Sequence, residues 1–524
     1  MGISRRQLLG AGVIVGAGLV GAAALPARAH SGTPRRMPTS RLPKPYSVPF
    51  ARPPLAVPLR TDASTDYHRI VMAPIRAEII PGFSTTLWAY NGSVPGPTLR
   101  VARGRRVVAR FVNELPFLHP VLGYEAYTSI HLHGGASKPQ YDGYASDIIH
   151  PGQYKDYVWE NHECARPMWF HDHAVHHTWS NVHMGLAAQY WIDDPADDVF
   201  GLPRGDYEVP LHFSDALFQA DGELALHLDD LKGLWGDVML VNGRPWPRMT
   251  VHRRKYRFRM VNGCVSRTLF WRLSTGDPVV VVATDAGLVP QPISVTKVRH
   301  VNGERFDVVI DFAKYPPGTR VELRNDSLPY NEDFPNTDRI MAFDVVDEPF
   351  DPANNDVPAL LAPDNPVMTR PASDSRRVRN LRTKRQGGEW TINGHTWHDV
   401  IDSRFRLVEA SPLLGTTEVW EYQNNSGGWS HPMHTHGVDA RLLSRNGRAP
   451  YPYEVGPKDT FHVGENEKLR ILVCFDLPGK YMIHCHNGVH EDHDMMSQYQ
   501  TVDPAGPAPD PFSAPALPLP DPPL

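Results

Sequence analysis

The 524-residue sequence predicts an all-β fold of three tandem β-sandwich domains, because three features of the chain agree. An Asn-Gly turn signal recurs at constant spacing, an alternating strand pattern follows each signal, and helical periodicity is scarce. The 51 prolines also suit a protein rich in strands and loops. Because a chain of this length exceeds what one hydrophobic core supports, several domains are expected in any case.

The repeat sets the domain plan. The turn signals Asn91-Gly92, Asn242-Gly243 and Asn393-Gly394 lie 151 residues apart both times. After each signal comes a strand with apolar residues at every second position and an asparagine at its end. These strands are predicted at Arg106–Asn113, Lys255–Asn262 and Thr417–Asn424. We therefore predict domains at residues 45–203, 204–360 and 380–502.

The two ends of the chain differ from the domains. Arg5-Arg6 precedes a Gly/Ala-rich apolar stretch that ends in Ala27-Arg28-Ala29, which resembles a twin-arginine export signal with a cleavage site. We expect residues 1–29 to be removed and the protein to be secreted or to lie in the periplasm or cell envelope, without stable membrane insertion. An uncleaved membrane anchor is the alternative. Residues 503–524 are dominated by proline and alanine, which predicts a disordered or extended tail.

Composition narrows the function classes. A formal net charge of −5 argues against a nucleic-acid-binding surface, and 26 histidines are the first indication of metal. The four cysteines Cys164, Cys264, Cys474 and Cys485 allow at most two disulfide bonds. If Cys485 binds a metal, three remain and one of them stays unpaired; their pairing is left open.

Four His-x-His pairs carry the functional signal, and all lie in the first and third predicted domains. In a β-strand, residues i and i+2 point to the same face, so each pair presents two imidazoles side by side. One such pair would be an unremarkable surface feature, but four pairs in two domains indicate a cluster of metal ions. The pairs are His131/His133, His171/His173, His434/His436 and His484/His486.

The segment from His484 to Met495 is the most specific one. Strand alternation sends His484 and His486 to one face and Cys485 to the other, so one strand joins two metal sites. Cys485, His490, Met495 and an upstream histidine form the ligand set of blue copper, with methionine as the weak axial ligand. Zinc is the alternative for cysteine and histidine, but so many donors exceed what one or two zinc ions need.

These four motifs resemble the copper motifs of multicopper oxidases, in the family's order along the chain. They are His131-Leu132-His133-Gly134, Trp169-Phe170-His171-Asp172-His173, His431-Pro432-Met433-His434-Thr435-His436 and His484-Cys485-His486. Within the family, bilirubin oxidases are the most similar group, through segments such as Gly427-Gly428-Trp429-Ser430 and Glu491-Asp492-His493-Asp494. The resemblance implies cupredoxin-like Greek-key sandwiches and four copper ions.

The resemblance also implies the role of each ligand. His431, Cys485, His490 and Met495 would hold the type 1 copper, and His131 and His434 the type 2 copper. The type 3 pair would take His133, His171 and His486 on one ion and His173, His436 and His484 on the other. A reductant would give single electrons at the type 1 copper, and the three-copper cluster would reduce dioxygen to water.

Three further residues are candidates for catalytic roles. Asp142 and Glu491 match the positions that the family uses to deliver protons, although hydrogen bonding to the ligating imidazoles also requires carboxylates. Trp429 lies two residues before His431 and is expected either to tune that copper, to pass electrons or to fill the core.

The reductant is expected to be a small organic molecule, a bilirubin-like tetrapyrrole or a phenol, and the protein a monomer. A laccase or an aminophenol oxidase of the phenoxazinone synthase type is the alternative. A metal-ion oxidase or copper-tolerance protein is less favoured, because no methionine-rich run lies near His490. A copper nitrite reductase would lack the four His-x-His pairs.

Overall fold

The computed structural model describes residues 36–524 apart from 227, 229–231, 376 and 508. The predicted signal, residues 1–29, lies outside the described residues. The described chain is mostly β-strand, as predicted, and its only α-helices are short: α1 (Thr178–Met184), α2 (Pro366–Thr369), α3 (Trp397–Asp402) and α4 (Gly488–Asp492). Within these residues no helix is long and apolar enough to cross a membrane.

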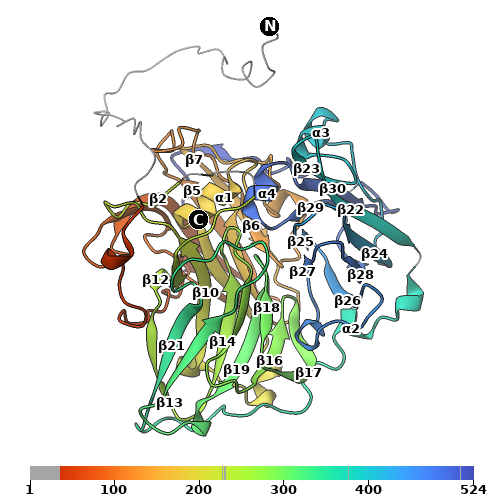
Figure 1. The fold of residues 1–524 in the computed structure, drawn as a ribbon. Helices are drawn as coiled ribbons and strands as arrows, with labels where there is room; N and C mark the ends of the chain where they lie inside the picture. The colour runs from red at the N-terminus through yellow and green to blue at the C-terminus, as the bar shows by residue number, and fades with distance from the viewer. Residues whose placement is uncertain (1–35, 227, 229–231, 376, 508) are drawn as a thin grey trace. The chain divides into compact units, whose positions relative to one another are not determined.

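The strands form six sheets, two from each third of the described chain (Figure 1). The first third contributes β1 (Arg60–Thr61), β2 (Thr65–Ala77), β3 (Thr85–Tyr90), β5 (Arg106–Asn113) and β7 (Gln153–Trp159) to one sheet, and β4 (Leu99–Ala102), β9 (Ala187–Asp193), β8 (Arg166–Asp172) and β6 (Ile130–His133) to the other.

The second third has a seven-stranded and a five-stranded sheet. In the larger sheet the order of the strands is β12 (Arg244–Pro245), β11 (Val238–Val241), β10 (Glu208–Ala216), β14 (Lys255–Asn262), β19 (Arg305–Asp311), β16 (Val279–Thr284) and β17 (Gly287–Val295). The smaller runs β13 (Arg248–His252), β21 (Arg339–Val346), β20 (Arg320–Asn325), β15 (Leu269–Leu273), β18 (Val298–His300).

The last third has a five-stranded and a four-stranded sheet. One runs β23 (Glu389–Ile392), β22 (Val378–Gln386), β24 (Thr416–Asn424), β28 (Lys468–Phe475), β26 (Asp439–Arg445), and the other β27 (Thr460–Val463), β25 (His431–Thr435), β29 (Gly479–Cys485), β30 (Met496–Thr501). The chain therefore has the predicted three β-sandwiches, while the stated domain bounds stay a prediction.

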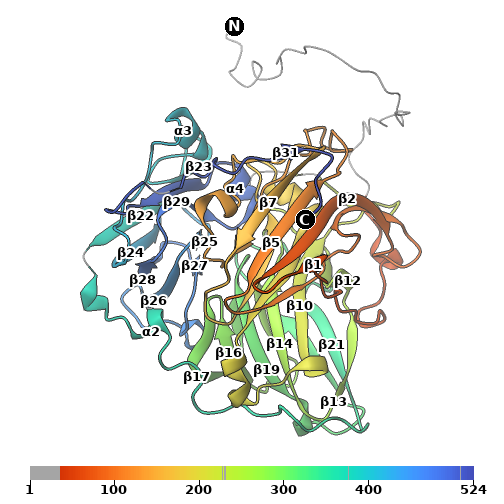
Figure 2. The same cartoon turned by 180° about the vertical axis from the view of Figure 1, so that it is seen from behind.

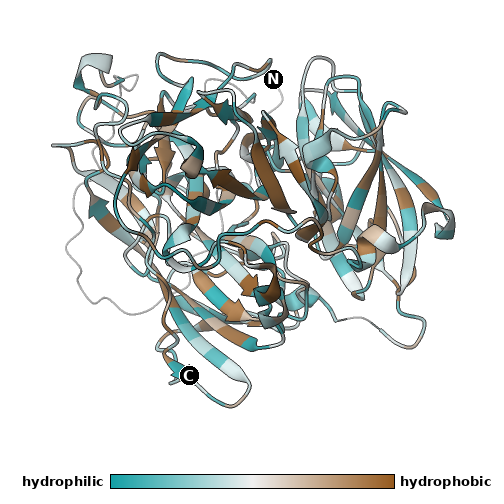
Figure 3. Ribbon diagram, turned by 90° about the horizontal axis from the view of Figure 1, so that it is seen from below, coloured by the Kyte–Doolittle hydropathy of each residue, from teal (hydrophilic) through white to brown (hydrophobic). Residues whose placement is uncertain are grey.

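The sequence repeat is also a structural repeat. The predicted alternating strands coincide with β5 and β14, and β24 begins one residue before its predicted start. Apolar residues alternate with polar ones along several strands in Figure 3, which is the pattern of strands with one face toward a core. In each domain the strand pairs in parallel with an earlier one: β2 with β5, β10 with β14 and β22 with β24.

Each turn asparagine has the same role. Its backbone lies in the left-handed region, which asparagine tolerates better than most residues, and its side-chain oxygen accepts a hydrogen bond from a neighbouring strand. The φ angles are 48° at Asn91, 51° at Asn242 and 53° at Asn393. The donors are the backbone N–H groups of Val71, His212 and Arg382.

The asparagine that ends each alternating strand holds the loop that follows. In the third domain, the side-chain amide of Asn424 donates to the backbone carbonyls of Trp429 and Gly464, and its oxygen accepts from Ser426. This loop leads directly into His431. Asn113 and Asn262 bond their own loops in the same way.

The C-terminal segment decides between the two predicted alternatives, a disordered and an extended tail. Its described residues are extended but not disordered: β31 (Leu517–Pro518) pairs with β7, as Figure 2 shows. The carboxylate of Asp521 accepts two hydrogen bonds from Arg69, at 2.8 and 3.0 Å. Phe512 packs against Tyr144 and Phe405, with ring centroids 5.4 and 4.9 Å apart. Composition indicated disorder because proline-rich chains form no core of their own, yet they can pack on an existing domain.

We predict that Phe512→Ala lowers the thermal unfolding temperature. The change removes two aromatic contacts, each contributing ~0.5–1.5 kcal/mol. Calorimetry of the purified protein measures the effect, and a chain ending at residue 508 should lose at least as much. Phe117→Ala, at a phenylalanine that is 66% exposed, is the control and should unfold at the parent temperature. Equal unfolding temperatures for all four proteins would mean that the segment contributes nothing to stability.

Candidate metal centre

Two strand pairs bring the four His-x-His motifs together. In the first domain, β6 pairs with β8 so that His131 lies opposite His171. In the third domain, β25 pairs with β29 so that His434 lies opposite His484. Side chains that are directly opposite in an antiparallel pair point to the same face, so each sheet presents two motifs together. The remaining histidines of each motif lie on the same strands or directly after them.

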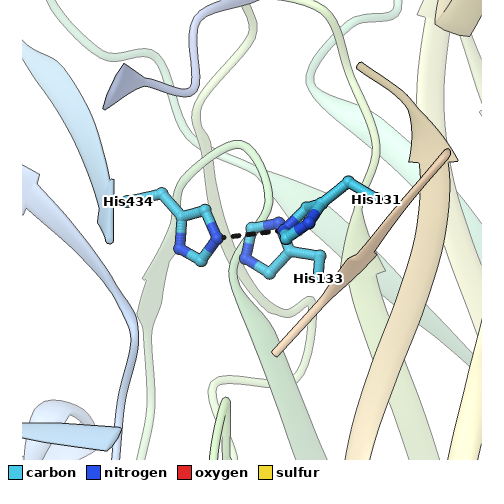
Figure 4. A group of neighbouring side chains, drawn as sticks. All are labelled: His131, His133 and His434. Atoms are coloured by element: carbon cyan, nitrogen blue, oxygen red, sulfur yellow. Dashed lines mark hydrogen bonds between the residues drawn. The ribbon is translucent and has the colours of Figure 1, made fainter. Parts of the chain in front are cut away.

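The structure gathers the predicted ligands into compact, buried groups of candidate donors, and four of these groups together contain all eleven predicted histidine and cysteine ligands. In each group the candidate donor atoms lie within 4.8 Å of one another. The groups are His131, His133 and His434; His133, His171 and His486; His173, His436 and His484; and His431, Cys485 and His490. Figure 4 shows the first of them, in which His434 approaches His131 and His133 from the opposite side.

Hydrogen bonds at the outer edges of three of these rings select one tautomer of the imidazole. The Nδ1–H of His131 donates to the carbonyl of Asp142 at 2.6 Å, and the Nδ1–H of His171 to the carbonyl of Asp172 at 2.8 Å. In the same way, Nδ1–H of His434 donates to the carbonyl of Asp459 at 3.1 Å. Because one nitrogen is protonated, Nε2 of each ring carries a lone pair toward the centre of its group.

Burial keeps these imidazoles neutral. Desolvation lowers the pKa of His484 and of His431 to about 3, and that of His173 and of His486 to about 4. A neutral imidazole with an outward hydrogen bond is the form that binds metal ions. The groups therefore need no deprotonation of histidine before they bind a cation.

The inner nitrogen atoms converge at distances that suit a shared ion. His131 Nε2 and His434 Nε2 are 3.4 Å apart, His173 Nε2 and His484 Nε2 are 3.2 Å apart, and His436 Nε2 and His484 Nε2 are 3.1 Å apart. Two nitrogens bound at about 2.0 Å to one tetrahedral ion are separated by roughly 3.3 Å. Lone pairs that face each other across such a gap repel unless a cation lies between them, and Nε2 of buried His171 has no hydrogen-bond partner in the described structure.

The fourth group has a sulfur donor. Cys485 Sγ is 3.5 Å from Nδ1 of His431 and 3.7 Å from Nδ1 of His490. The outer nitrogen of His431 donates to Ser426 Oγ, and that of His490 to the carbonyl of Lys232, so both Nδ1 atoms carry lone pairs. Burial raises the pKa of the Cys485 thiol, so a bound metal must displace its proton. Met495 is fully buried, and its carbonyl accepts a hydrogen bond from the Cys485 backbone.

None of the four cysteines forms a disulfide bond, which answers the open question of their pairing. Cys264 and Cys474 are buried, and Cys164 is partly exposed. The free thiol of Cys485 is therefore available as a ligand.

The two predicted proton carriers flank the histidine groups from different sides. The Asp142 carboxylate accepts from Nδ1–H of His436 at 2.8 Å, and burial raises the pKa of Asp142 well above its ordinary value. The Glu491 carboxylate lies 3.0 Å from Nδ1 of His484 and 3.5 Å from Nδ1 of His173. Neither oxygen of Glu491 makes a hydrogen bond within the described structure, although the residue is buried.

Around the sulfur group, the structure adds a residue that the sequence did not indicate. The ring of Trp390 lies 4.2 Å from that of His490 and 5.2 Å from that of His431. The predicted Trp429 is half-buried and meets His490 edge-on at 6.0 Å. Trp390 belongs to β23, which is far from every histidine motif in the sequence. No regular spacing in the sequence connects it to these motifs.

The second domain also reaches the metal centre, although it has no His-x-His pair. Arg305 from this domain makes two hydrogen bonds to Asp459, at 2.7 and 2.6 Å. Burial by itself would raise the pKa of Asp459. The positive charge of Arg305 and its hydrogen bonds have the larger effect and hold this pKa well below its usual range. Asp459 and Thr460 in turn lie 3.3 and 3.0 Å from Nε2 of His133. In the sequence, Arg305 is recognisable only as a residue of a strand. This does not distinguish an arginine next to the metal centre from one that only stabilises the fold.

Comparisons with known proteins agree with this geometry. Two family models, both described as multicopper oxidase, match the chain, one over residues 73–197 and the other over residues 365–505. The chain is 37% identical to a bilirubin oxidase of Albifimbria verrucaria over 482 residues, which cover 87% of this chain and 81% of that protein. It is 30% identical to a laccase of Bacillus subtilis, covering 85% and 96% of the two chains. The crystal structure of a multi-copper oxidase from Pediococcus acidilactici is similar, with a TM-score of 0.78, 27% identity, and 91% and 96% of the chains covered.

We predict that the copper-loaded protein is blue and that Cys485→Ser is colourless, because the colour arises from charge transfer between thiolate and copper. Absorption spectra and copper content of both proteins measure this. Cys474→Ser is the matched control, since that cysteine is also buried but lies outside the four groups. A blue Cys485→Ser protein, or a colourless parent with four coppers, would contradict the assignment.

Proposed function

Because this chain belongs to the multicopper oxidase family, we propose that it couples the one-electron oxidation of an aromatic or tetrapyrrole reductant to the reduction of dioxygen to water. It is a copper-dependent oxidoreductase with oxygen as acceptor.

The four groups of donors fit four copper ions. His431, Cys485, His490 and Met495 would hold the type 1 ion, His131 and His434 the type 2 ion, and the other six histidines the type 3 pair: His133, His171, His173, His436, His484 and His486. When bound, these ions would take up single electrons from four reductant molecules and pass them to one dioxygen, which with four protons forms two waters.

A single observation carries the proposal: Cys485 lies between His484 and His486, and the three side chains belong to different donor groups. The thiol serves the group of His431 and His490, whereas its two neighbours serve the histidine cluster. Consecutive Cα atoms are about 3.8 Å apart, so the two sites are joined by a covalent path on the order of 10 Å. A protein that only stores copper has no need of such a link.

The surroundings of His490 support an aromatic reductant. Its outer nitrogen donates to the carbonyl of Lys232, and Trp390 and half-buried Trp429 lie against its ring. Tyr330 continues this aromatic group, with its ring 6.0 Å from that of Trp429. Trp390 and His490 are fully buried, so the partly exposed rings of Trp429 and Tyr330 are the ones on which a flat, conjugated donor would stack.

The reductant is best tested by oxygen consumption with bilirubin, 2,6-dimethoxyphenol and o-aminophenol under identical conditions. We expect the highest kcat/KM with bilirubin, in line with the name of the relative from Albifimbria verrucaria. A preference for the phenol would favour the laccase alternative, in line with the Bacillus relatives. A preference for the aminophenol would favour a phenoxazinone synthase type of oxidase.

We also propose that the protein is exported by the twin-arginine route and acts as a monomer outside the cytoplasm. Residues 1–29 carry the signal pattern described above. Replacing Arg5 and Arg6 by lysine should leave the full-length chain in the cytoplasm, as measured by cell fractionation. Light scattering of the mature protein tests the oligomeric state.

We predict that Met495→Leu leaves the protein folded and blue but raises the reduction potential of the type 1 copper. A thioether donates weakly to the oxidised ion, and leucine cannot replace that donation. Spectroelectrochemical titration measures the potential. Met496→Leu, at the next buried methionine, is the control and should leave the potential unchanged. The reverse result would move the axial ligand to Met496.

We predict that Glu491→Gln slows the oxidation of the reduced enzyme by dioxygen and leaves its reduction by substrate near the parent rate. Glutamine keeps the shape of the side chain but cannot act as an acid, and loss of a general acid costs ~100-fold or more. Stopped-flow spectroscopy measures the two half-reactions separately.

Copper analysis of the same samples separates proton transfer from a purely structural role. If Glu491 only orients His484 and His173, its loss weakens metal affinity by ~10-fold to ~100-fold and copper is lost instead. Glu421→Gln is the control, because that carboxylate pairs with Lys468 and Arg470 away from the metal centre. A Glu491→Gln protein with four coppers and normal reoxidation would leave Asp142 as the candidate.

A further inference from the structure

A cavity of about 50 Å³ lies between the first and second domains, outside the four donor groups. Eleven of its eighteen lining residues have apolar side chains and three are glycines, so its wall is mostly apolar. Apolar cavities of this kind hold small apolar molecules such as xenon, and roughly 10–15 Å³ suffices for one particle of the size of water. The cavity is therefore large enough for a diatomic gas.

The inner end of the cavity lies close to the histidine cluster. Ala187 lines the cavity, and in the pairing of β8 with β9 it is the direct partner of His171. Directly paired residues share one face of the sheet with their Cβ atoms about 5 Å apart. His212 also lines the cavity, and its ring lies 6.0 Å from that of Trp169, which stacks on His171 at 4.1 Å. One layer of side chains thus separates the cavity from a candidate type 3 ligand.

The outer end of the cavity meets a second hollow. A cleft of about 320 Å³ has polar residues such as Arg52 and Arg244 in its lining. The cleft and the cavity share four lining residues: Ile79, Val94, Pro95 and Gly243. The cleft therefore adjoins the cavity at a wall made of these four residues, and Ala187 lines the cavity beyond this wall.

The shared wall is closely packed at a glycine. Gly243 has a φ of 73°, and a Cβ at this position would lie 2.7 Å from the carbonyl oxygen of Val94. Any larger residue would fill the junction between the two hollows. The second Asn-Gly turn of the repeat, Asn242-Gly243, therefore has a local reason for its glycine beyond turn geometry.

The few polar groups in the cavity are neutral or paired. Burial lowers the pKa of His183 and of His212 to about 4, so both imidazoles are uncharged. The Asp215 carboxylate accepts a hydrogen bond from Arg267 at 2.8 Å. Nε2 of His183 and Nδ1 of His212 have no partner in the described structure, so ordered water at these two atoms is the competing occupant.

We propose that this cavity is a binding chamber for dioxygen and that the cleft and cavity together form its route to the side of the cluster at His171. The proposal rests on the oxidase function for the identity of the gas. It assigns Val94 and Ile79 to the entrance of the chamber and Ala187 to its exit. Reductant, in contrast, would dock near Trp429, on the side of Cys485.

Xenon tests the chamber directly, without any measurement of activity. Crystals of the copper-loaded protein are pressurised with xenon, and we expect a xenon peak between Val94 and Ala187. A cavity that contains only ordered water bound to His183 and His212, with no xenon, would overturn the proposal.

Kinetics test the route. Val94→Phe fills the shared wall and should lower the second-order rate constant for reoxidation of the reduced enzyme by dioxygen several-fold, with anaerobic reduction by substrate unchanged. Ala216→Leu fills the chamber itself and serves as a second variant. Val280→Phe is the matched control, because Val280 is also half-buried but lines neither hollow.

The outcomes are distinct from a failure of the proposed function. If the reductant is assigned wrongly, substrate reduction changes with the donor while xenon binding and the effect of Val94→Phe persist. If xenon binds but both filled variants reoxidise at the parent rate, the route is wrong. The copper content of each variant shows whether metal has been lost. For a variant that has lost copper, the xenon experiment alone tests whether the cavity binds a gas.

Discussion

The structure depends on one electrostatic constraint: many unprotonated nitrogen atoms and one sulfur are buried within a few ångströms of one another. Burial and the neighbouring imidazoles hold these rings neutral, and hydrogen bonds on the outer side of several rings direct their lone pairs inward. Without cations such an arrangement is repulsive and incompletely hydrogen-bonded. Metal binding and native packing are therefore linked, as they are in other sites built from buried histidine and cysteine.

The three sandwiches supply different parts of that arrangement. The first and third domains bring His-x-His motifs together on paired strands, because cross-strand pairing places two motifs on one face. The second domain contributes no such motif, but its Arg305 neutralises Asp459 at the edge of the cluster. A buried carboxylate so close to His133 would be costly without this partner. The middle domain thus supports the metal centre electrostatically.

The proposed reactants approach from separate sides. Aromatic side chains surround the sulfur group, carboxylates flank the histidine cluster, and an apolar cavity ends next to His171. The polarity of each environment matches the reactant proposed for it: aromatic side chains for a conjugated donor, carboxylates for protons and an apolar cavity for dioxygen. On β29, the sheet geometry separates the sulfur group from the histidine cluster, since neighbouring residues on one strand point in opposite directions.

The sequence by itself determined the fold class, the three-fold repeat and the pairing of histidines on single strands. Strand periodicity and His-x-His spacing are local, and a resemblance to known motifs supplied the rest. Only the tertiary structure showed Trp390 beside His490, Arg305 on Asp459, the free cysteines, the packed C-terminal segment and the cavity. The contacts among these features join segments far apart in the chain, such as Phe512 with Tyr144 or Val94 with Gly243. Composition and periodicity indicate which face of a strand a side chain lies on. They do not specify which distant segment of the chain packs against that face.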